Sequence, residues 1–198
     1  MSLGCVVLAA GNAARFGRNK LAEDFRGKPL IRWALEAVPV DRLGPNYAGV
    51  PAPVCVVTQY PDVGMLAAAF GFGGVFNEAP ELGISHSVVL GTRALMHRCG
   101  GLMFLVADQP LLRRETAAAL ADRFLADPTR IVVPAAGDRQ GNPCIFPAAL
   151  YPELLALTGD RGGKAVIRRH PELVAEVSVP EEELFDVDSV SDLESLAE

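Results

Sequence analysis

Lysine is scarce in this sequence of 198 residues: Lys20, Lys28 and Lys164 are its three lysines, and every other basic residue except histidine is an arginine. Acidic residues outnumber basic ones, so the formal net charge is −6. A chain of this charge lacks the electrostatic footprint of proteins that bind nucleic acid or anionic membranes in general. We therefore expect neither as a partner. Each lysine stands close to a glycine, where a compact ammonium group can meet a phosphate.

Cysteine is also sparse, and no two cysteines form a C-x-x-C pair; the four are Cys5, Cys55, Cys99 and Cys144. This spacing argues against a metal cluster and favours reduced thiols in a cytosol, so we expect a cytoplasmic protein. No apolar run reaches the roughly 18 residues needed to cross a bilayer. The first residues also lack the basic lead of a signal peptide.

Half of all residues in the sequence, 50%, are hydrophobic. Over its first two thirds, apolar runs alternate with helical patterns. The runs predict strands at residues 5–9, 54–58, 74–77, 102–106 and 130–133. The helical patterns cover residues 29–38, 62–70, 85 or 87 to 98, and 115–126. Near-continuous apolar strands are typical of a parallel sheet that is buried on both faces. The sequence therefore predicts an α/β fold: a Rossmann-like, mostly parallel sheet flanked by helices on both faces.

The last third of the sequence is less regular, with a strand expected at 144–146 and helices at 152–157 and from 191. We expect a single domain of residues 1–198, divided into a regular part of about 1–134 and a smaller irregular part of about 135–198. Ligands of such sheets bind outside the carboxyl ends of the strands. The loops after Ala10, Val106 and Val133 should therefore share one edge.

The strongest local signal is the loop after the first strand, residues 8–20, with the sequence LAAGNAARFGRNK. Gly11 and Gly17 allow backbone N–H groups to approach an anion closely. Arg15 and Lys20 supply charge for a triphosphate. The glycine spacing fits neither G-x-G-x-x-G nor G-x-x-x-x-G-K-S/T. An ordinary strand-to-helix turn with exposed cations is the competing interpretation.

This loop resembles the L-A-A-G-x-S-x-R-F-G-x-x-K signature of the molybdenum cofactor cytidylyltransferase family, whose relatives include the corresponding guanylyltransferases and other small nucleotidylyltransferases. Ala13 stands where the family usually has serine, which removes one hydroxyl contact. Six further motifs resemble those of the family in the same order: Gly27-Lys28-Pro29-Leu30, Gly83-Ile84-Ser85-His86-Ser87, Ala107-Asp108-Gln109-Pro110, Gly141-Asn142-Pro143 with Phe146, Gly159-Asp160-Arg161-Gly162-Gly163-Lys164, and Asp186-Val187-Asp188-Ser189 with Asp192.

The resemblance implies attack of an acceptor phosphate oxygen on the α-phosphorus of a nucleoside triphosphate, with pyrophosphate as the leaving group. Both partners are anionic, so the enzyme must neutralise charge and align the attack. Arg15, Lys20 and Asp108 are the expected catalytic residues. The expected nucleotide-binding set is Leu8, Ala9, Ala10, Gly11, Arg15, Lys20, Ser87 and Asp108. For Ser87, helix capping is the alternative role.

Asp108 follows a buried strand, where a carboxylate suits Mg²⁺, with Mn²⁺ as an alternative metal. A turn residue before Pro110 is the competing role. By resemblance, Asp188 is the second metal ligand, and Asp186 is the alternative. Capping of the last helix by Asp188 or Ser189 competes with that assignment.

The acceptor should meet Asn142, Pro143, Gly163 and Lys164, so residues 1–134 form the nucleotide-binding half and residues 135–198 the acceptor-binding half. Lys164 could instead only begin a helix. The pair Ala9-Ala10 favours CTP by resemblance, and Mo-molybdopterin is the first choice of acceptor, with a molybdoenzyme as recipient of the product. The alternatives are GTP, another small phosphorylated acceptor, a nucleotide-dependent oxidoreductase on the same scaffold, and a non-catalytic chaperone for a molybdoenzyme.

Overall fold

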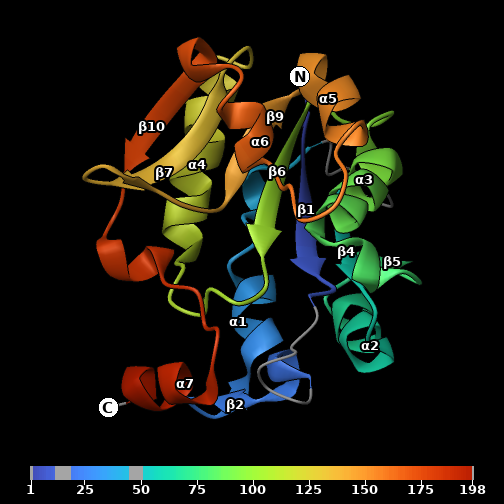
Figure 1. The fold of residues 1–198 in the computed structure, drawn as a ribbon, viewed down its shortest axis with the longest axis vertical. Coiled ribbons are helices and arrows are strands. Elements are labelled where there is room, and N and C mark those ends of the chain that lie inside the picture. Colours follow the sequence, from blue (N-terminus) through green and yellow to red (C-terminus); the bar gives the residue numbers. More distant parts are fainter. Residues whose placement is uncertain (1, 12–18, 45–50, 198) are drawn as a thin grey trace.

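A central β-sheet carries the molecule, with its strands running between two layers of helices (Figure 1). The computed structural model describes residues 2–11, 19–44 and 51–197. Eight strands form the sheet in the order β10-β7-β9-β6-β1-β4-β5, with β8 paired to β7 outside this path. Their bounds are β1 Leu3–Ala9, β4 Val54–Thr58, β5 Gly73–Phe76, β6 Gly101–Val106, β7 Ile131–Ala136, β8 Arg139–Gln140, β9 Cys144–Pro147 and β10 Val174–Ser178.

The central strands of the sheet are buried on both faces, which explains why their sequences are continuous apolar runs. Along β1, Leu3, Cys5 and Val7 belong to one core cluster, whereas Val6 belongs to the other. Side chains alternate between the faces of a strand, so a strand covered on both sides needs apolar residues at every position. The predicted arrangement, with helices on both faces of a mostly parallel sheet, is confirmed.

The helices divide between these two faces. Helices α1, α2, α4 and α7 contribute to one cluster, and α3, α5 and α6 contribute to the other. Their bounds are α1 Leu30–Glu36, α2 Pro61–Ala69, α3 Ile84–Leu95, α4 Arg114–Ala126, α5 Tyr151–Leu155, α6 Lys164–Ile167 and α7 Val190–Ala197. Pro29 has an extended backbone with ψ 142° and precedes α1, so this helix begins one residue later than expected.

Strand direction gathers the important loops at one edge. β1 is parallel to both β4 and β6. β9 lies antiparallel between β6 and β7, so β6 and β7 also run in the same direction. The loops that follow β1, β6 and β7 therefore leave the same edge, as the sequence predicts. The expected boundary near residue 134 lies within β7, and the division into two halves stays a prediction.

The sequence analysis missed β10, which pairs in parallel with β7 at the end of the sheet. Its burial is only partial, and Glu176 in its centre is exposed. An edge strand with one polar face carries too weak an apolar pattern to be distinguished from a loop.

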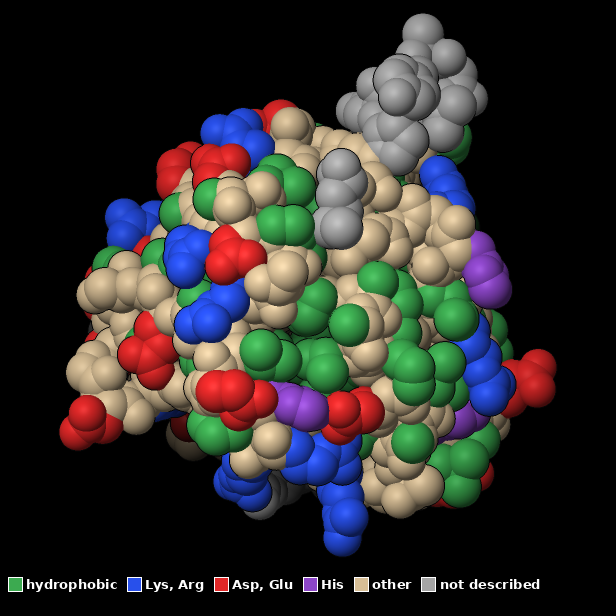
Figure 2. Space-filling model, turned by 90° about the horizontal axis from the view of Figure 1, so that it is seen from above, with side chains coloured by type: hydrophobic (Ala, Val, Ile, Leu, Met, Phe, Trp, Pro, Cys, Tyr) green, Lys and Arg blue, Asp and Glu red, His purple; other side chains and the backbone are tan. Residues whose placement is uncertain are grey.

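The C-terminal segment returns to the opposite end of the molecule from β10. Figure 1 shows α7 beside the small hairpin formed by β2 (Asp24–Phe25) and β3 (Lys28–Pro29). The guanidinium of Arg26 donates a hydrogen bond to the carbonyl of Leu196 at 2.7 Å. Residues 179–189 thus pass the strand ends on their way to α7. The helices of the described ranges include none that is long and apolar enough to cross a membrane. The face in Figure 2 carries basic and acidic side chains around an apolar middle.

Candidate active site

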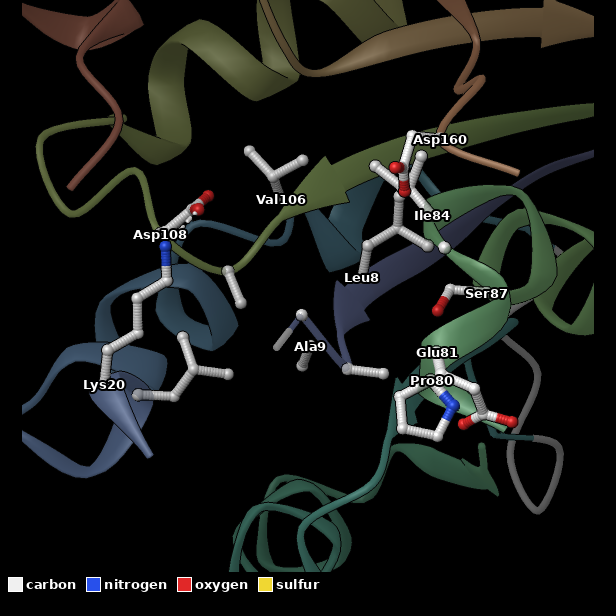
Figure 3. A pocket seen from close by; sticks show the side chains of 15 residues that line it. Leu8, Ala9, Lys20, Pro80, Glu81, Ile84, Ser87, Val106, Asp108 and Asp160 are labelled. Carbon is white, nitrogen blue, oxygen red and sulfur yellow. Dashed lines mark hydrogen bonds and ion pairs between the residues drawn. The ribbon is translucent and has the colours of Figure 1, made fainter. Parts of the chain in front are cut away.

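A pocket of about 440 Å³ lies where β1 and β6 end, between the start of α3 and the residues around Lys20 (Figure 3). Seven of the residues that the sequence assigns to the nucleotide line it: Leu8, Ala9, Ala10, Gly11, Lys20, Ser87 and Asp108. Arg15, the eighth, lies outside the described residues. Figure 3 places Lys20 and Asp108 together at one side of the pocket, with Ser87 and Glu81 at the other.

Lys20 joins three parts of the chain at this edge. Its Nζ lies 2.8 Å from Asp108 Oδ2 and donates a second hydrogen bond of 2.8 Å to the carbonyl of Val187. The N–H of Val187 in turn donates to the Asp108 carbonyl at 2.9 Å. Asn19 caps the short helical turn that carries Lys20 by accepting from the N–H of Leu21 at 3.0 Å. The loop after β1, the end of β6 and the C-terminal segment are therefore fixed together.

The contacts of Lys20 with Asp108 and Val187 form what we call the Lys20 clamp. It holds Asp186 and Asp188, the neighbours of Val187 in the chain, close to Asp108. Burial and the negative charges of Asp108 and Asp188 raise the pKa of Asp186, while a hydrogen bond from Gln109 and the charge of Arg139 oppose the rise. Asp186 thus lies within electrostatic reach of both Asp108 and Asp188. Within the described ranges, no group of three or more His, Cys, Asp or Glu side chains is arranged as a ready metal site. A pair of carboxylates at the edge of this pocket nevertheless fits the donor set of Mg²⁺.

The hydrogen bonds at the start of α7 show which of Asp188 and Ser189 caps this helix. Ser189 Oγ accepts from the N–H of Asp192 at 3.3 Å, and Asp192 Oδ2 accepts from the N–H groups of Ser189 and Asp188 at 2.7 and 2.8 Å. This reciprocal pattern is a capping box. Ser189 is therefore the capping residue.

Three consecutive side chains at the end of the neighbouring strand β4 hold the backbone where β1 ends. Thr58 Oγ1 donates to the carbonyl of Ala9, Gln59 Nε2 donates to that of Ala10, and the Tyr60 hydroxyl donates to that of Gly11. The distances are 3.0, 3.0 and 3.2 Å. These bonds fix the backbone path at the point where it enters the pocket.

Ser87 enters the same pocket from α3. This helix begins at Ile84 after Gly83, so Ser87 lies within the first turn and does not cap it. The buried Asn77 donates from Nδ2 to Ser87 Oγ at 3.0 Å, and its Oδ1 accepts from the N–H of Ala79 and lies 2.8 Å from His86 Nδ1. Because Ser87 Oγ accepts from Asn77, its own proton is available for an acceptor in the pocket.

A second pocket of about 390 Å³ adjoins the first, and both are lined by Leu8, Ile84, Val106 and Asp160. Three of the residues that the sequence assigns to the acceptor line this second pocket: Asn142, Gly163 and Lys164. Pro143 is buried behind them, after a cis peptide bond, and does not line it. Lys164 is also the first residue of α6, so both interpretations of this lysine describe its position.

Several pocket residues escaped the sequence analysis, namely Pro80, Glu81, Ile84, Asp160, Arg161 and Arg168. Asp160 and Arg161 belong to a motif that was recognised, but no role was assigned to them. Gly83 shows how closely this motif packs: a Cβ on it would lie 2.5 Å from Asp160 Oδ1 and 2.6 Å from the Gly159 carbonyl. Pro80 and Glu81 lie in a segment whose composition is typical of a turn, and this composition does not predict that they line a pocket.

Comparisons with known proteins agree with this architecture. A nucleotidyl transferase from Methanothermobacter thermautotroptrophicus has a TM-score of 0.79 at 20% identity, covering 99% of this chain and 96% of that one. Rv0371c from Mycobacterium tuberculosis H37Rv in complex with manganese has a TM-score of 0.75 at 24% identity and 100% and 98% coverage. Molybdopterin-guanine dinucleotide biosynthesis protein A from Archaeoglobus fulgidus has a TM-score of 0.69 at 17% identity and 98% and 96% coverage.

Sequence comparison extends the same relationship. The bifunctional protein GlmU of Pelobacter propionicus is 31% identical over 123 residues, which cover 60% of this chain and 25% of GlmU. The chain thus spans about a quarter of the length of the curated relatives that it matches. The model of the MobA-like NTP transferase domain matches residues 5–174.

The fold is that of the NTP transferases, enzymes that move a nucleotide from a nucleoside triphosphate to an acceptor. The chain belongs to the MobA-like NTP transferase family.

Proposed function

We propose that this enzyme transfers CMP from CTP to a small phosphorylated acceptor, with Mo-molybdopterin as the first candidate, and releases pyrophosphate. The observation that carries the proposal is the Lys20–Asp108 pair at the strand edge, in a pocket that opens into a second pocket. Two joined pockets suit a reaction between two bound substrates, because holding both in line removes most of the entropic barrier.

The first pocket holds the nucleoside triphosphate in this proposal. Ala9, Ala10 and Gly11 present the backbone beside it, and the Ser87 hydroxyl donates a hydrogen bond to the nucleotide. Lys20, together with Arg15, neutralises charge on the α-phosphate and on the leaving pyrophosphate. Stabilising charge that develops in the transition state is worth more in a site held in place beforehand than in water.

Asp108 and Asp188 would hold a divalent metal ion beside the phosphates, with Mg²⁺ proposed and Mn²⁺ as the alternative. A bound divalent ion would supply Lewis-acid stabilisation of phosphate charge. The manganese complex of Rv0371c supports the use of a divalent ion by this fold. The residues of the chain have a separate task, since Lys20 ties Asp108 to the C-terminal segment and so sets the distance between the two carboxylates.

The second pocket takes the acceptor, through Asn142, Gly163 and Lys164, with Pro143 shaping its wall from behind. We assign the nucleotide to the half of residues 1–134 and the acceptor to the half of residues 135–198 on this basis. CTP is proposed because Ala9-Ala10 resembles the cytidylyltransferase signature. GTP is the alternative that the guanine dinucleotide protein of the same fold supports. A molybdoenzyme is the proposed recipient of the product.

The test is pyrophosphate release by the purified protein with Mg²⁺ and Mo-molybdopterin, comparing CTP, GTP and ATP. Release with CTP alone, lost in Asp108→Asn, is the expected result. Release with GTP alone would reassign the base. A folded protein that releases none with any nucleotide, yet carries a tightly bound flavin or nicotinamide, would favour the oxidoreductase.

A further inference from the structure

Three basic side chains line the second pocket: Arg161, Lys164 and Arg168. Lys164 begins α6 and Arg168 caps its C-terminal end, four residues apart, which brings their side chains to one side of the helix, whereas Arg161 lies in the loop before it. All three residues are exposed. None of them forms an ion pair within the part of the chain that the structure describes, and Arg161 and Arg168 donate no side-chain hydrogen bond there.

The neighbouring Arg169 provides the contrast. It does not line the pocket, and its Nη2 lies 2.8 Å from Glu153 Oε2. Several other cations of this acidic protein are paired in the same way, as Arg42 is with Asp122 and Arg113 with Glu183. Among the described residues, three cations without an ion pair thus line one cavity, whereas the adjacent cation outside it is paired.

The floor between these cations is apolar. Val88, Phe104, Phe146 and Leu154 line it, and the two phenylalanine rings meet edge to face with centroids 5.9 Å apart. Asp160 is the one acidic residue among the described residues that line this pocket. An apolar floor with a cationic rim complements a ligand that has an apolar body and an anionic end.

The three cations line only the second pocket, whereas Lys20 and Asp108 line only the first. The two pockets meet at Leu8, Ile84, Val106 and Asp160. A phosphate that reacts beside Lys20 leaves the cations of the second pocket without an anionic partner. A further negative group on the molecule that fills this pocket would give these cations a partner there.

We infer that the acceptor carries a second anionic group, separated from its reacting phosphate by an apolar body, and that Arg161, Lys164 and Arg168 bind this group. The inference rests on the proposed function, because it takes the second pocket to be the acceptor site. It narrows the acceptor to molecules with two anionic groups. Arg161 and Arg168 then determine specificity for the acceptor.

The test uses two probes that differ in one group, phenyl phosphate and 4-carboxyphenyl phosphate. Each is titrated calorimetrically into the full chain at constant ionic strength, with and without Mg²⁺ and CTP. We expect 4-carboxyphenyl phosphate to bind about tenfold more tightly, the ratio that one charge-assisted hydrogen bond supplies. Arg161→Gln/Arg168→Gln should abolish this ratio, and Arg169→Gln, which removes the same kind of charge outside the pocket, should preserve it.

Equal affinities of the two probes for the unaltered protein would overturn the inference, as would a ratio that survives the double substitution. A separate titration with CTP keeps the two proposals apart. Binding of CTP without discrimination between the probes would leave the nucleotide site standing and remove the second anion site. Weaker CTP binding in the double variant would show that the cations serve the nucleotide, which also contradicts the inference.

Discussion

Lys20 Nζ lies 2.8 Å from Asp108 Oδ2, although 88 residues separate them in the sequence. Their side chains are 14% and 25% exposed, so both charges are largely withdrawn from water. The same ammonium group also binds the carbonyl of Val187, next to Asp186 and Asp188. One lysine therefore sets the relative positions of the carboxylates proposed to hold the metal.

Asp108→Asn should reduce nucleotidyl transfer by more than about a hundredfold, the range seen when one group that stabilises transition-state charge is lost. The amide keeps the size of the side chain and can still accept a hydrogen bond from Lys20. The melting temperature should therefore change little, which differential scanning calorimetry can check. Substantial remaining activity in a folded variant would remove Asp108 from the catalytic set.

Lys20→Met should weaken both nucleotide affinity and the attachment of the C-terminal segment. The methionine fills the space of the lysine stem but cannot bind Asp108 or Val187. We expect faster hydrogen exchange in residues 184–189, measured by mass spectrometry, together with a higher KM for the nucleotide. Lys28→Met is the matched control, because Lys28 binds Glu36 and stacks on Trp33 away from both pockets. Unchanged hydrogen exchange in residues 184–189 of Lys20→Met would show that the Lys20 clamp does not hold the C-terminal segment in place.

Asp186→Asn should stabilise the protein at neutral pH. Burial and the charges of Asp108 and Asp188 raise the pKa of Asp186, so the folded state binds its proton more tightly than the unfolded chain does. The ionised carboxylate then costs stability above the raised folded pKa, and this cost disappears as the pH falls below the unfolded value of about 3.9. Neighbouring atoms cover part of the carboxyl group, but the residue as a whole is exposed, so the gain in melting temperature should be only about 1–2 °C. A gain that is the same at pH 3 and pH 8 would contradict this account.

Asn77→Asp should change the direction of the Ser87 hydroxyl. A carboxylate has no N–H to donate, so the hydroxyl proton would turn towards it and away from the pocket. The KM for the nucleotide should rise about tenfold, the value of one hydrogen bond, with a smaller effect on kcat. Ser87→Ala should raise KM to a similar degree. A higher KM in only one of the two variants would show that Asn77 does not act through the Ser87 hydroxyl.

Gly83→Ala should destabilise the protein by about 1–3 kcal/mol because of backbone strain and steric contact. Gly83 has φ 83°, and an added Cβ would collide with Asp160 and Gly159. Gly71 has a similar φ of 76° but open space around its Cβ position, so Gly71→Ala isolates the backbone contribution. Chemical denaturation of both variants measures the difference. Equal destabilisation would mean that the contact with residues 159–160 adds nothing.

The strands that surround the site were predictable because burial on both faces gives them unbroken apolar sequences. The loop after β1 was recognisable because its glycines and cations are adjacent in the chain. The partners of Asp108 were harder to find. That Lys20 binds both Asp108 and the Val187 carbonyl depends on where the C-terminal segment passes the strand ends, and no local pattern states this.

The same reasoning explains the missing parts of the second pocket. Arg168 and Asp160 become pocket residues only because α6 and the preceding loop pack against α3 and β9. An exposed arginine on a short helix is indistinguishable in sequence from a solvated one. The cap of α7 shows the opposite case, since Ser189 and Asp192 stand three residues apart in a motif that sequence alone displays.

The most direct test of nucleotidyl transfer follows the label of the nucleotide. The enzyme is incubated with Mg²⁺, Mo-molybdopterin and CTP labelled with ³²P at either the α- or the γ-phosphate, and the products are separated. Cleavage between the α- and β-phosphorus atoms predicts that α-label joins the acceptor and γ-label leaves in pyrophosphate. Transfer of γ-label to the acceptor, or its release as inorganic phosphate with CDP, would contradict the account.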